Sequence, residues 1–290
     1  MYNLYKNKTF KSKEDILIAY EFKVNDKSSS KKPINNIYLS KKNTSSSDTE
    51  DSDENNENDN DRLKPKLKVD SNDNFFSPVP YVKDNEISAI SYFIAGVSGS
   101  GKSHYTSQLV NNILTLKRFN NIGHLKEAAD VYLITSAILD DPAYEKNLKK
   151  YFKLDINHED FFNLTFSDFK NCIVIFDDVT SMSNKILELF IARLQKSIGE
   201  NSRKNNVALI SISHQSRDFN KTKYLIHEAN YYILFPHASW NDSKKFLKSY
   251  LDYDDNQLKK IKKISTKTRG ICLHKCCPIY TISDKLIYLD

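Results

Sequence analysis

Glycine is scarce in this chain, with six residues in 290. Three of the six, Gly96, Gly99 and Gly101, lie in one short segment that follows an apolar run and precedes an amphipathic one. Glycine is the residue that tolerates a left-handed backbone and the close approach of another group. Its concentration in this segment predicts a local requirement for such a backbone.

Long apolar runs are also missing. No run approaches the roughly 18 residues needed to span a membrane, and no signal-peptide pattern occurs. There are four cysteines, Cys172, Cys272, Cys276 and Cys277. The last three share the segment CLHKCC with His274, where the spacing is too tight for two chelating pairs and the pattern alternates like a strand. We therefore expect a soluble protein in a reducing compartment, with no membrane insertion and no zinc site.

Charge is unevenly distributed in the N-terminal part of the chain. Residues 48–61 hold eight acidic side chains and no basic one. Such a segment cannot bury enough apolar area to offset its ordering entropy, so we expect disorder within a low-complexity acidic linker at 25–80. Before it, residues 1–24 are expected to form a short element, in which the capping-box pattern SKED predicts a helix through ILIAYEF.

The rest of the chain is divided into a core at 81–240 and an appendage at 241–290. The formal net charge is +6, and the appendage holds 11 basic and six acidic residues. A solvated surface and contact with a polyanion both account for that excess. The appendage sequence predicts a helix, a second, lysine-rich helix and a terminal hairpin.

The glycine-rich segment GVSGSGKS fits the pattern G-x-x-x-x-G-K-[ST] between an apolar strand and a helix. In such a loop successive backbone N–H groups surround a β-phosphate, and side chains would obstruct the approach. Lys102 supplies positive charge for the β- and γ-phosphates, and Ser103 a hydroxyl ligand for Mg²⁺. ATP and Mg²⁺ are therefore the predicted cofactors. The predicted nucleotide-binding residues are Gly96, Val97, Ser98, Gly99, Ser100, Gly101, Lys102, Ser103 and His104.

Two adjacent acids, Asp177 and Asp178, follow a buried apolar run at 173–176. Ligands bind at the carboxyl ends of the strands in α/β sheets. Asp177 is predicted to hold Mg²⁺, and Asp178 to orient and deprotonate the attacking water. A turn-initiating pair of acids after a core strand is the structural alternative.

The chain is predicted to be an α/β P-loop protein with a central, mostly parallel five-stranded sheet. The strand candidate at 206–216 ends in His214 and Gln215. If this strand lies between the P-loop strand and the acidic strand, Gln215 faces the γ-phosphate as a sensor. A glutamine satisfied within its own loop is the alternative. The other strands are predicted at SAISYFIA, DVYLITSA, CIVIF and NYYILFP.

Several nucleotide-dependent classes fit the loop but not the other motifs. No LSGGQ-like signature of an ABC ATPase occurs. A small-molecule or nucleotide kinase is expected to carry its loop near the N-terminus and an arginine-rich lid, whereas this loop begins at Gly96 and no such lid is evident. The kinase remains an alternative, as does a non-enzymatic assembly protein that binds ATP only for structure. Intact Lys102, Asp177 and Asp178 argue against the latter.

Four stretches, in this order, resemble the genome-packaging ATPases of large double-stranded DNA viruses, the poxvirus-type branch of the FtsK–HerA superfamily. They are GVSGSGKSHY, IVIFDDV, SRKNNVALISISHQS and HEANYYILFP, over roughly 90–240. The third discriminates most, because the family pairs a strand that ends in glutamine with a basic residue just before it. The resemblance implies a RecA-like fold. A non-viral DNA pump of the same superfamily is the nearest alternative, although such pumps normally carry membrane spans.

The resemblance also implies roles for single residues. Gln215 looks like the sensor glutamine, and Arg203 like the arginine finger that reaches the γ-phosphate of a neighbouring subunit. Arg193 and Arg217 are the reserve candidates for the finger. The chain departs from the family in having His214 where a smaller or hydroxyl residue is common, and in lacking an arginine just before the last core strand.

The function that the resemblance implies is ATP-driven packaging of double-stranded DNA into a capsid. Such enzymes are homo-oligomeric rings that grip DNA phosphates without sequence preference. The implied partners are the DNA and a capsid or portal protein, and the implied location is the virion and the viral factory in the host cytoplasm. The lysines of 138–170 and the basic appendage are the candidate DNA-gripping regions.

Overall fold

The computed structural model describes the chain in segments, and the longest interval between them is 42–67. The acidic segment 48–61, and with it the predicted disorder, lies outside the described residues, as do Gln215 and Arg217. The described ranges are 2–7, 16–23, 33–41, 68–70, 74–80, 90–120, 127–179, 182–214, 219–266, 268–276 and 279–289.

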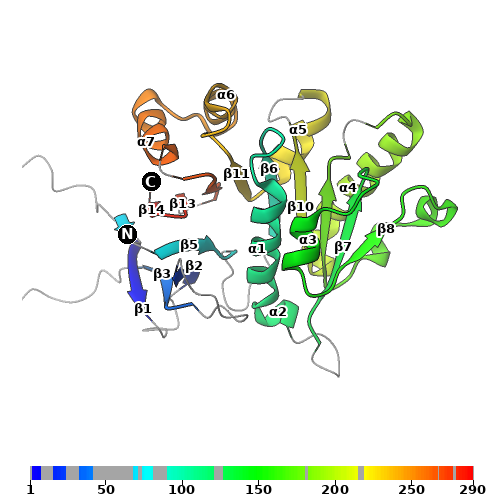
Figure 1. The fold of residues 1–290 in the computed structure, drawn as a ribbon, viewed down its shortest axis with the longest axis horizontal. Helices are drawn as coiled ribbons and strands as arrows, with labels where there is room; N and C mark the ends of the chain where they lie inside the picture. Colours follow the sequence, from blue (N-terminus) through cyan, green and yellow to red (C-terminus); the bar gives the residue numbers. More distant parts are fainter. Residues whose placement is uncertain are drawn as a thin grey trace, which may run out of the picture.

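A ten-stranded sheet runs through the molecule in the order β4-β14-β13-β12-β11-β6-β10-β9-β7-β8 (Figure 1). The six strands from β11 to β8 are parallel, and β10 lies between β6 and β9, as predicted. All residues of β6 and β10 are buried, which is why these strands read as continuous apolar runs. The parallel strands are β6 (Ile90–Ala95), β7 (Asp130–Thr135), β8 (Phe152–Leu154), β9 (Cys172–Asp177), β10 (Val207–Ser213) and β11 (Tyr231–Leu234).

The predicted α/β class with a mostly parallel central sheet is confirmed, and the sheet extends beyond the five predicted strands. The hairpin predicted at the end of the appendage is present, because β13 pairs antiparallel with β12 and with β14, and it continues the sheet by antiparallel pairing of β12 with β11. The added antiparallel strands are β12 (Ile271–His274), β13 (Tyr280–Ser283), β14 (Leu286–Leu289) and β4 (Lys68–Asp70).

Helices cover both faces of this sheet. Alternate residues of β6 face opposite ways: Tyr92 and Ile94 pack in the core on the α1 side, and Phe93 and Ala95 in the core under α5, α6 and α7. This alternation follows from the two-residue period of a strand. The helices are α1 (Lys102–Leu114), α2 (Lys117–Asn120), α3 (Pro142–Asn147), α4 (Lys185–Asn205), α5 (Phe219–Glu228), α6 (Trp240–Leu251) and α7 (Asp255–Ser265), with short 3₁₀ turns at 159–163 and 166–168.

The N-terminal part differs from its prediction. The segment ILIAYEF forms strand β2 and not a helix, and strands occur within the predicted linker. Ile18, Ala19 and Ile37 are fully buried against the core around α1, so tertiary burial overrides the local capping pattern. The strands form a second, antiparallel sheet in the order β1-β3-β2-β5. They are β1 (Tyr2–Asn7), β2 (Ile16–Lys23), β3 (Asn35–Lys41) and β5 (Asn74–Pro78).

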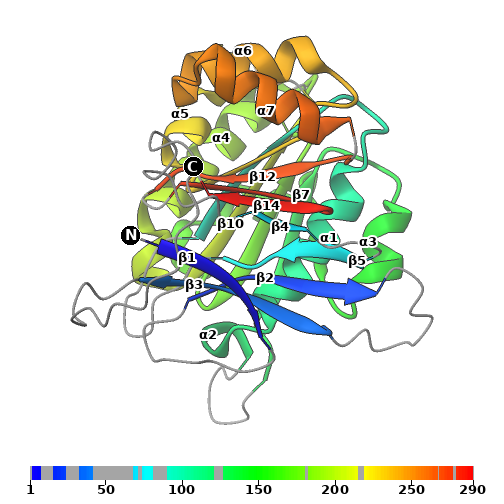
Figure 2. The same ribbon diagram turned by 90° about the vertical axis from the view of Figure 1, so that its left-hand side faces the viewer.

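In Figure 2 the small sheet lies below β12 and β14, and α6 and α7 lie above them. Backbone contact between Phe76 and Asp284 joins the two sheets directly, with a hydrogen bond of 2.8 Å. The boundaries at 81 and 241 stay predictions. In the described part of the chain, no helix has the length and apolar character to cross a membrane.

Candidate nucleotide-binding site

The glycine-rich loop connects the carboxyl end of β6 to the first turn of α1. Gly99 and Gly101 have φ of 74° and 99°, in the left-handed region that favours glycine. A Cβ at Gly96 would lie 2.8 Å from Ser100 Oγ and 2.9 Å from the Phe235 ring. Glycine is therefore required by backbone conformation at Gly99 and Gly101, and by lack of space at Gly96.

Lys102 folds back onto its own loop. Its Nζ donates hydrogen bonds to the carbonyl oxygens of Gly96 and Val97, at 2.8 and 3.1 Å, and lies 3.3 Å from His214 Nδ1. Burial lowers the pKa of Lys102, although the carboxylates at the end of β9 oppose that shift. The ammonium group is thus held by neutral oxygens, which phosphate oxygens could replace.

Asp177 ends β9 and faces the first turn of α1. Tyr144, on α3, is buried and donates a hydrogen bond of 2.8 Å from its hydroxyl to Asp177 Oδ2. The same hydroxyl interacts with the Ser103 side chain. Burial raises the pKa of Asp177, and the hydrogen bond from Tyr144 opposes the rise. Burial, with Asp177 beside it, raises the pKa of Tyr144 well above its usual value.

Asp178 adopts a backbone conformation that is uncommon for a residue with a side chain, with φ of 54°. Ser136 fixes it by donating a hydrogen bond of 2.6 Å from its hydroxyl to the Asp178 carbonyl oxygen. His214 Nε2 lies 3.2 Å from Asp178 Oδ2. In the tautomer in which Nδ1 accepts from Lys102, Nε2 donates to Asp178, and the three side chains then form a continuous hydrogen-bonded chain.

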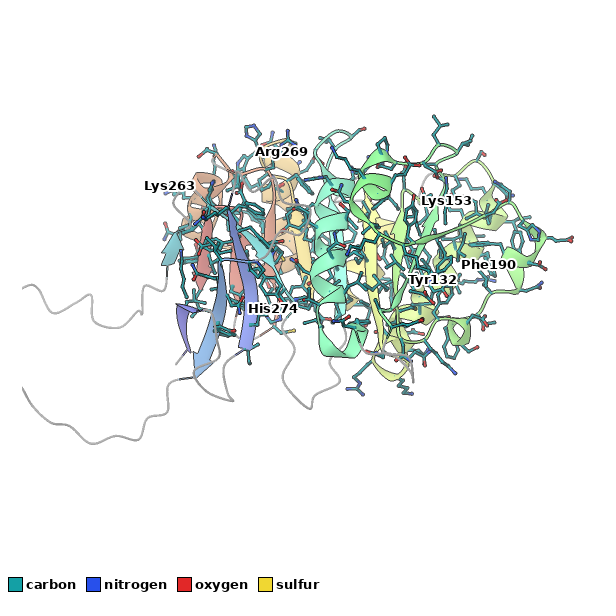
Figure 3. All side chains as sticks on the ribbon, turned by 60° about the horizontal axis from the view of Figure 1, so that its bottom comes forward. Tyr132, Lys153, Phe190, Lys263, Arg269 and His274 are labelled. Atoms are coloured by element: carbon teal, nitrogen blue, oxygen red, sulfur yellow. The ribbon has the colours of Figure 1, made fainter. Side chains whose placement is uncertain are left out.

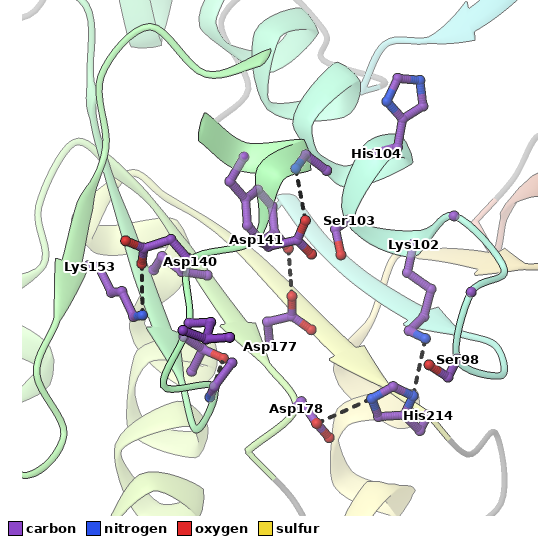
Figure 4. Close-up of a pocket in the computed structure, with 18 residues that line it drawn as sticks. Ser98, Lys102, Ser103, His104, Asp140, Asp141, Lys153, Asp177, Asp178 and His214 are labelled. Atoms are coloured by element: carbon purple, nitrogen blue, oxygen red, sulfur yellow. Dashed lines mark hydrogen bonds and ion pairs between the residues drawn. The ribbon is translucent and has the colours of Figure 1, made fainter. Parts of the chain in front are cut away.

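These groups surround one pocket of about 380 Å³ (Figure 4). Its outer wall comes from the segment between β7 and β8, where Lys153 Nζ pairs with Asp140 Oδ1 at 2.8 Å. Its described lining is Ser98, Gly99, Gly101, Lys102, Ser103, His104, Leu133, Thr135, Ala137, Leu139, Asp140, Asp141, Ala143, Tyr144, Lys153, Asp177, Asp178 and His214.

Most of the residues predicted from the loop and the acidic strand meet at this pocket. Gly96 and Val97 contribute through their carbonyl oxygens, and Ser100 is buried with no hydrogen-bond partner for its Oγ. Arg203 does not approach the pocket of its own chain. It is exposed in the last turn of α4, which lies at the amino ends of the parallel strands, whereas the pocket lies at their carboxyl ends. Arg193 is exposed on the same helix.

Several pocket residues carry no sequence signal. Asp140, Tyr144 and Lys153 belong to no motif, and only the folding of the segment after β7 brings them to the site. Arg269, in the turn before β12, also comes close: its Nη1 would be 3.8 Å from a Cβ at Gly101. Figure 3 shows Arg269 and Lys153 on either side of α1.

No protein-family model matches the chain. It is 27% identical over 210 residues to the uncharacterized protein V3 of the Sputnik virophage, covering 71% of this chain and 77% of the virophage protein.

Solved structures show similarity of fold at low sequence identity. The DNA-packaging ATPase B204 from Sulfolobus turreted icosahedral virus is 14% identical, with a TM-score of 0.41, and the match covers 67% of this chain and 97% of that one. The pCW3 conjugation coupling protein TcpA is 13% identical, with a TM-score of 0.42, covering 94% and 76%. The cytoplasmic domain of the Thermomonospora curvata type VII secretion ATPase EccC is 14% identical, with a TM-score of 0.46, covering 77% and 29%. These likenesses carry no functional argument, so function has to be argued from the site.

Proposed function

We propose that this chain is a Mg²⁺-dependent ATPase that moves double-stranded DNA. The observation that supports hydrolysis most directly is the convergence of Lys102, Ser103, Asp177 and Asp178 on one pocket of about 380 Å³. Lys102 and Ser103 reach it from the first turn of α1, directly after the glycine loop, and Asp177 and Asp178 from the end of β9. A metal-binding acid followed by a second acid is the arrangement that hydrolysis of a phosphoanhydride requires.

The residues fit a magnesium nucleotide. A Cβ at Gly96 would collide with the loop, and the buried Ser100 Oγ has no partner among the described residues. Both features suit a loop that wraps a phosphate with its backbone. Ser103 and Asp177 point toward the same space in Figure 4 and would hold the metal. Bound there with ATP, Mg²⁺ would neutralise charge on the β- and γ-phosphates.

Lys102 and Asp178 have separate proposed roles, in phosphate binding and in activation of the water. Lys102 exchanges the carbonyl oxygens of Gly96 and Val97 for phosphate oxygens, which gains a charge-assisted interaction. Asp178 orients a water and accepts its proton as the water attacks the γ-phosphorus. His214, which lies 3.2 Å from Asp178, holds that carboxylate in place. Gln215, the next residue, is proposed as the γ-phosphate sensor.

The proposed task of the ATPase is packaging of a viral genome. The four motifs in the order described above support this, and so does the similarity to a virophage protein over 71% of the chain. We propose that the chain is of the poxvirus type and contacts a capsid or portal protein. Its proposed location is the virion and the viral factory in the host cytoplasm.

A ring of identical subunits is part of the proposal. Ile138 and Leu139, beside the pocket mouth, are 95% and 83% exposed, which suits contact with another protein surface. No arginine lines the pocket within the part of the chain that the structure describes. An arginine from a second subunit would supply that charge, and Arg203 is the proposed finger.

The DNA-gripping surface is proposed on two lysine-bearing regions. Lys146 and Lys149 are exposed after the first turn of α3. Lys153 pairs with Asp140 in the pocket, so it is not among the lysines proposed to contact DNA. On α7, Lys259 and Lys263 are exposed. Contact with phosphates alone would make binding independent of sequence and steeply salt-dependent.

ATP hydrolysis by the full-length chain, with and without double-stranded DNA, tests the proposal. We expect DNA to raise the rate and Lys102→Ala to lower it by roughly 10²–10³-fold, the cost of removing one charge-stabilising group. Arg203→Ala should also be inactive, but mixing it with Lys102→Ala subunits should restore activity, because intact fingers then face intact loops.

Two results would contradict the proposal. A rate that ignores DNA but rises with a small phosphoryl acceptor would identify a kinase. Nucleotide binding without any hydrolysis would identify a structural nucleotide site. If Arg203→Ala and Lys102→Ala fail to complement each other while DNA still stimulates the wild type, only the assignment of the finger is wrong, and Arg193 or Arg217 becomes the candidate.

A further inference from the structure

Tyr144 occupies a position that neither the loop nor the acidic strand explains. It is 1% exposed, and its hydroxyl donates a hydrogen bond of 2.8 Å to Asp177 Oδ2 while it interacts with the Ser103 side chain. Ser103 and Asp177 are the two protein groups proposed to hold Mg²⁺. One phenol is therefore hydrogen-bonded to one of these groups and interacts electrostatically with the other.

The helix that carries Tyr144 is fixed at both ends. Asp141 caps its start by accepting a hydrogen bond of 2.8 Å from the Ala143 N–H, and Pro142 follows the cap. At its other end, Asn111 on α1 donates a hydrogen bond of 3.0 Å to the Asn147 carbonyl oxygen. The helix after the glycine loop thus holds the helix that carries the phenol.

This arrangement constrains the carboxylate of Asp177. A carboxylate on a strand end can rotate about its side-chain bonds, and both of its oxygens can accept hydrogen bonds. The Tyr144 hydroxyl engages Oδ2 and so fixes the rotation, while Oδ1 takes no part in this bond. Partners that orient a metal-binding carboxylate in this way raise metal affinity by 10–100-fold in well-studied sites.

We propose that Tyr144 is a positioning residue for the magnesium–nucleotide complex, which it serves by orienting the Asp177 carboxylate toward Ser103. The inference rests on the proposed ATPase function. It makes α3 part of the metal site, although α3 contributes no metal ligand. The hydroxyl group, and not the aromatic ring, performs this role.

Binding of a fluorescent, non-hydrolysable ATP analogue to the full-length chain tests this, with Mg²⁺ and with EDTA. We expect Tyr144→Phe to lower the affinity gained from Mg²⁺ about tenfold and to leave the affinity in EDTA unchanged. Tyr151→Phe is the matched control, because its ring lies 6.4 Å from the Tyr144 ring but it is not a pocket-lining residue. It should behave as wild type.

A second pair of variants keeps the test valid if Tyr144→Phe folds poorly. Asp141→Ala removes both a charge and the helix cap, whereas Asp141→Asn removes the charge but keeps a capping side chain. Asp141 lines the pocket, and both variants remove its charge, so the difference between them reports the cap. Asp141→Ala should weaken the Mg²⁺-dependent binding a few fold more than Asp141→Asn, because only Asp141→Ala loosens α3.

The outcomes separate the two proposals. If the wild type binds the analogue no better with Mg²⁺ than with EDTA, the proposed function itself is wrong. If the wild type shows the Mg²⁺ dependence and Tyr144→Phe retains it in full, or binds Mg²⁺ and the analogue more tightly, the positioning role is wrong while the ATPase proposal stands.

Discussion

The two walls of the nucleotide pocket are built in different ways. One wall is the glycine loop and the end of β9, where contiguous residues in special backbone conformations present Lys102 and Asp178. The other wall is the segment between β7 and β8, which brings Asp140, Tyr144 and Lys153 to the site without any motif. Groups that would touch phosphate are thus specified by local sequence, and groups that hold them in place are specified by packing.

Each charged group of the first wall has a partner within the protein. Asp177 accepts from Tyr144, Asp178 faces His214, and Lys102 donates to its own loop. A buried charge without a partner is costly, so these contacts stabilise the fold around the pocket. Substitutions in the first wall should therefore affect mainly the rate of hydrolysis. Substitutions in the second wall should affect mainly the orientation of the first-wall side chains and the stability of the fold.

The largest effect is expected from Asp177→Asn. Loss of the proposed metal-binding charge should lower hydrolysis by roughly 10²–10³-fold. Without ligand, however, the variant should be more stable at neutral pH. Burial raises the pKa of Asp177 in the folded state, so the stability it contributes below its usual pKa of 3.8 is lost as pH rises through the raised value.

Thermal melting between pH 4 and pH 8 measures this gain, which should shrink as the pH falls toward 3.8, where both side chains are neutral. A variant that is less stable than wild type at neutral pH would show that the hydrogen bond from Tyr144 outweighs the burial of the charge.

Gly96→Ala should produce the next largest effect. A Cβ there would lie 2.8 Å from Ser100 Oγ and 2.9 Å from Phe235, and overpacking of this kind costs about 1–3 kcal/mol. We expect nucleotide affinity to fall, as measured by titration calorimetry. Gly199→Ala in α4 is the matched control. Its Cβ would meet the ends of two side chains, the Tyr224 hydroxyl at 3.1 Å and Leu209 Cδ2 at 3.4 Å, and alanine suits a helix interior. Equal losses in both variants would contradict a special role for the loop glycine.

His214→Ala should have a smaller effect, confined to turnover. It removes the group beside Asp178 Oδ2, so we expect kcat to fall roughly tenfold while KM for ATP changes little. His237→Ala, an exposed histidine after β11, is the control and should leave both constants unchanged. A rise in KM without a fall in kcat would instead assign His214 to ATP binding through Lys102.

The sequence predicted the glycine loop, the two acids at the end of β9 and the middle of the sheet because all of them carry local signals. Buried parallel strands such as β6, β9 and β10 read as unbroken apolar runs, and the glycine loop requires particular residue types at fixed spacing. The place of β10 between β6 and β9 is the condition on which the predicted role of Gln215 depends, and the structure meets it. Arg203 and Gln215 stay predictions.

The parts that were missed depend on distant partners. Strand β2 pairs with β3 and with β5, and the burial of Ile18 and Ala19 becomes visible only when those strands are assembled. The capping-box pattern before β2 is a local signal that this burial overrides. Tyr144 is likewise one aromatic in a short helix until β7 and α1 bring it to Asp177.

The smallest effect on chemistry is expected in the small N-terminal sheet. Glu21 is 1% exposed and accepts hydrogen bonds from Asn35, Lys6 and Asn74, at 2.7, 2.9 and 3.3 Å. Burial acts to raise the pKa of Glu21, but these three bonds together leave it below the usual 4.5. Its charged form therefore stabilises the fold at neutral pH, and that contribution is lost as pH falls through the lowered pKa.

Glu21→Gln should therefore cost about 1–3 kcal/mol at pH 7, measured by denaturant unfolding, and less below pH 4.5, where wild type also loses the charge. Glu200→Gln, a half-exposed control on α4, should cost little. At a temperature where both variants are folded, kcat should match wild type, because the small sheet packs on α1 but contributes no residue to the pocket. A fall in kcat with stability intact would mean that the small sheet influences catalysis through α1. Residues that affect turnover would then not be confined to the pocket.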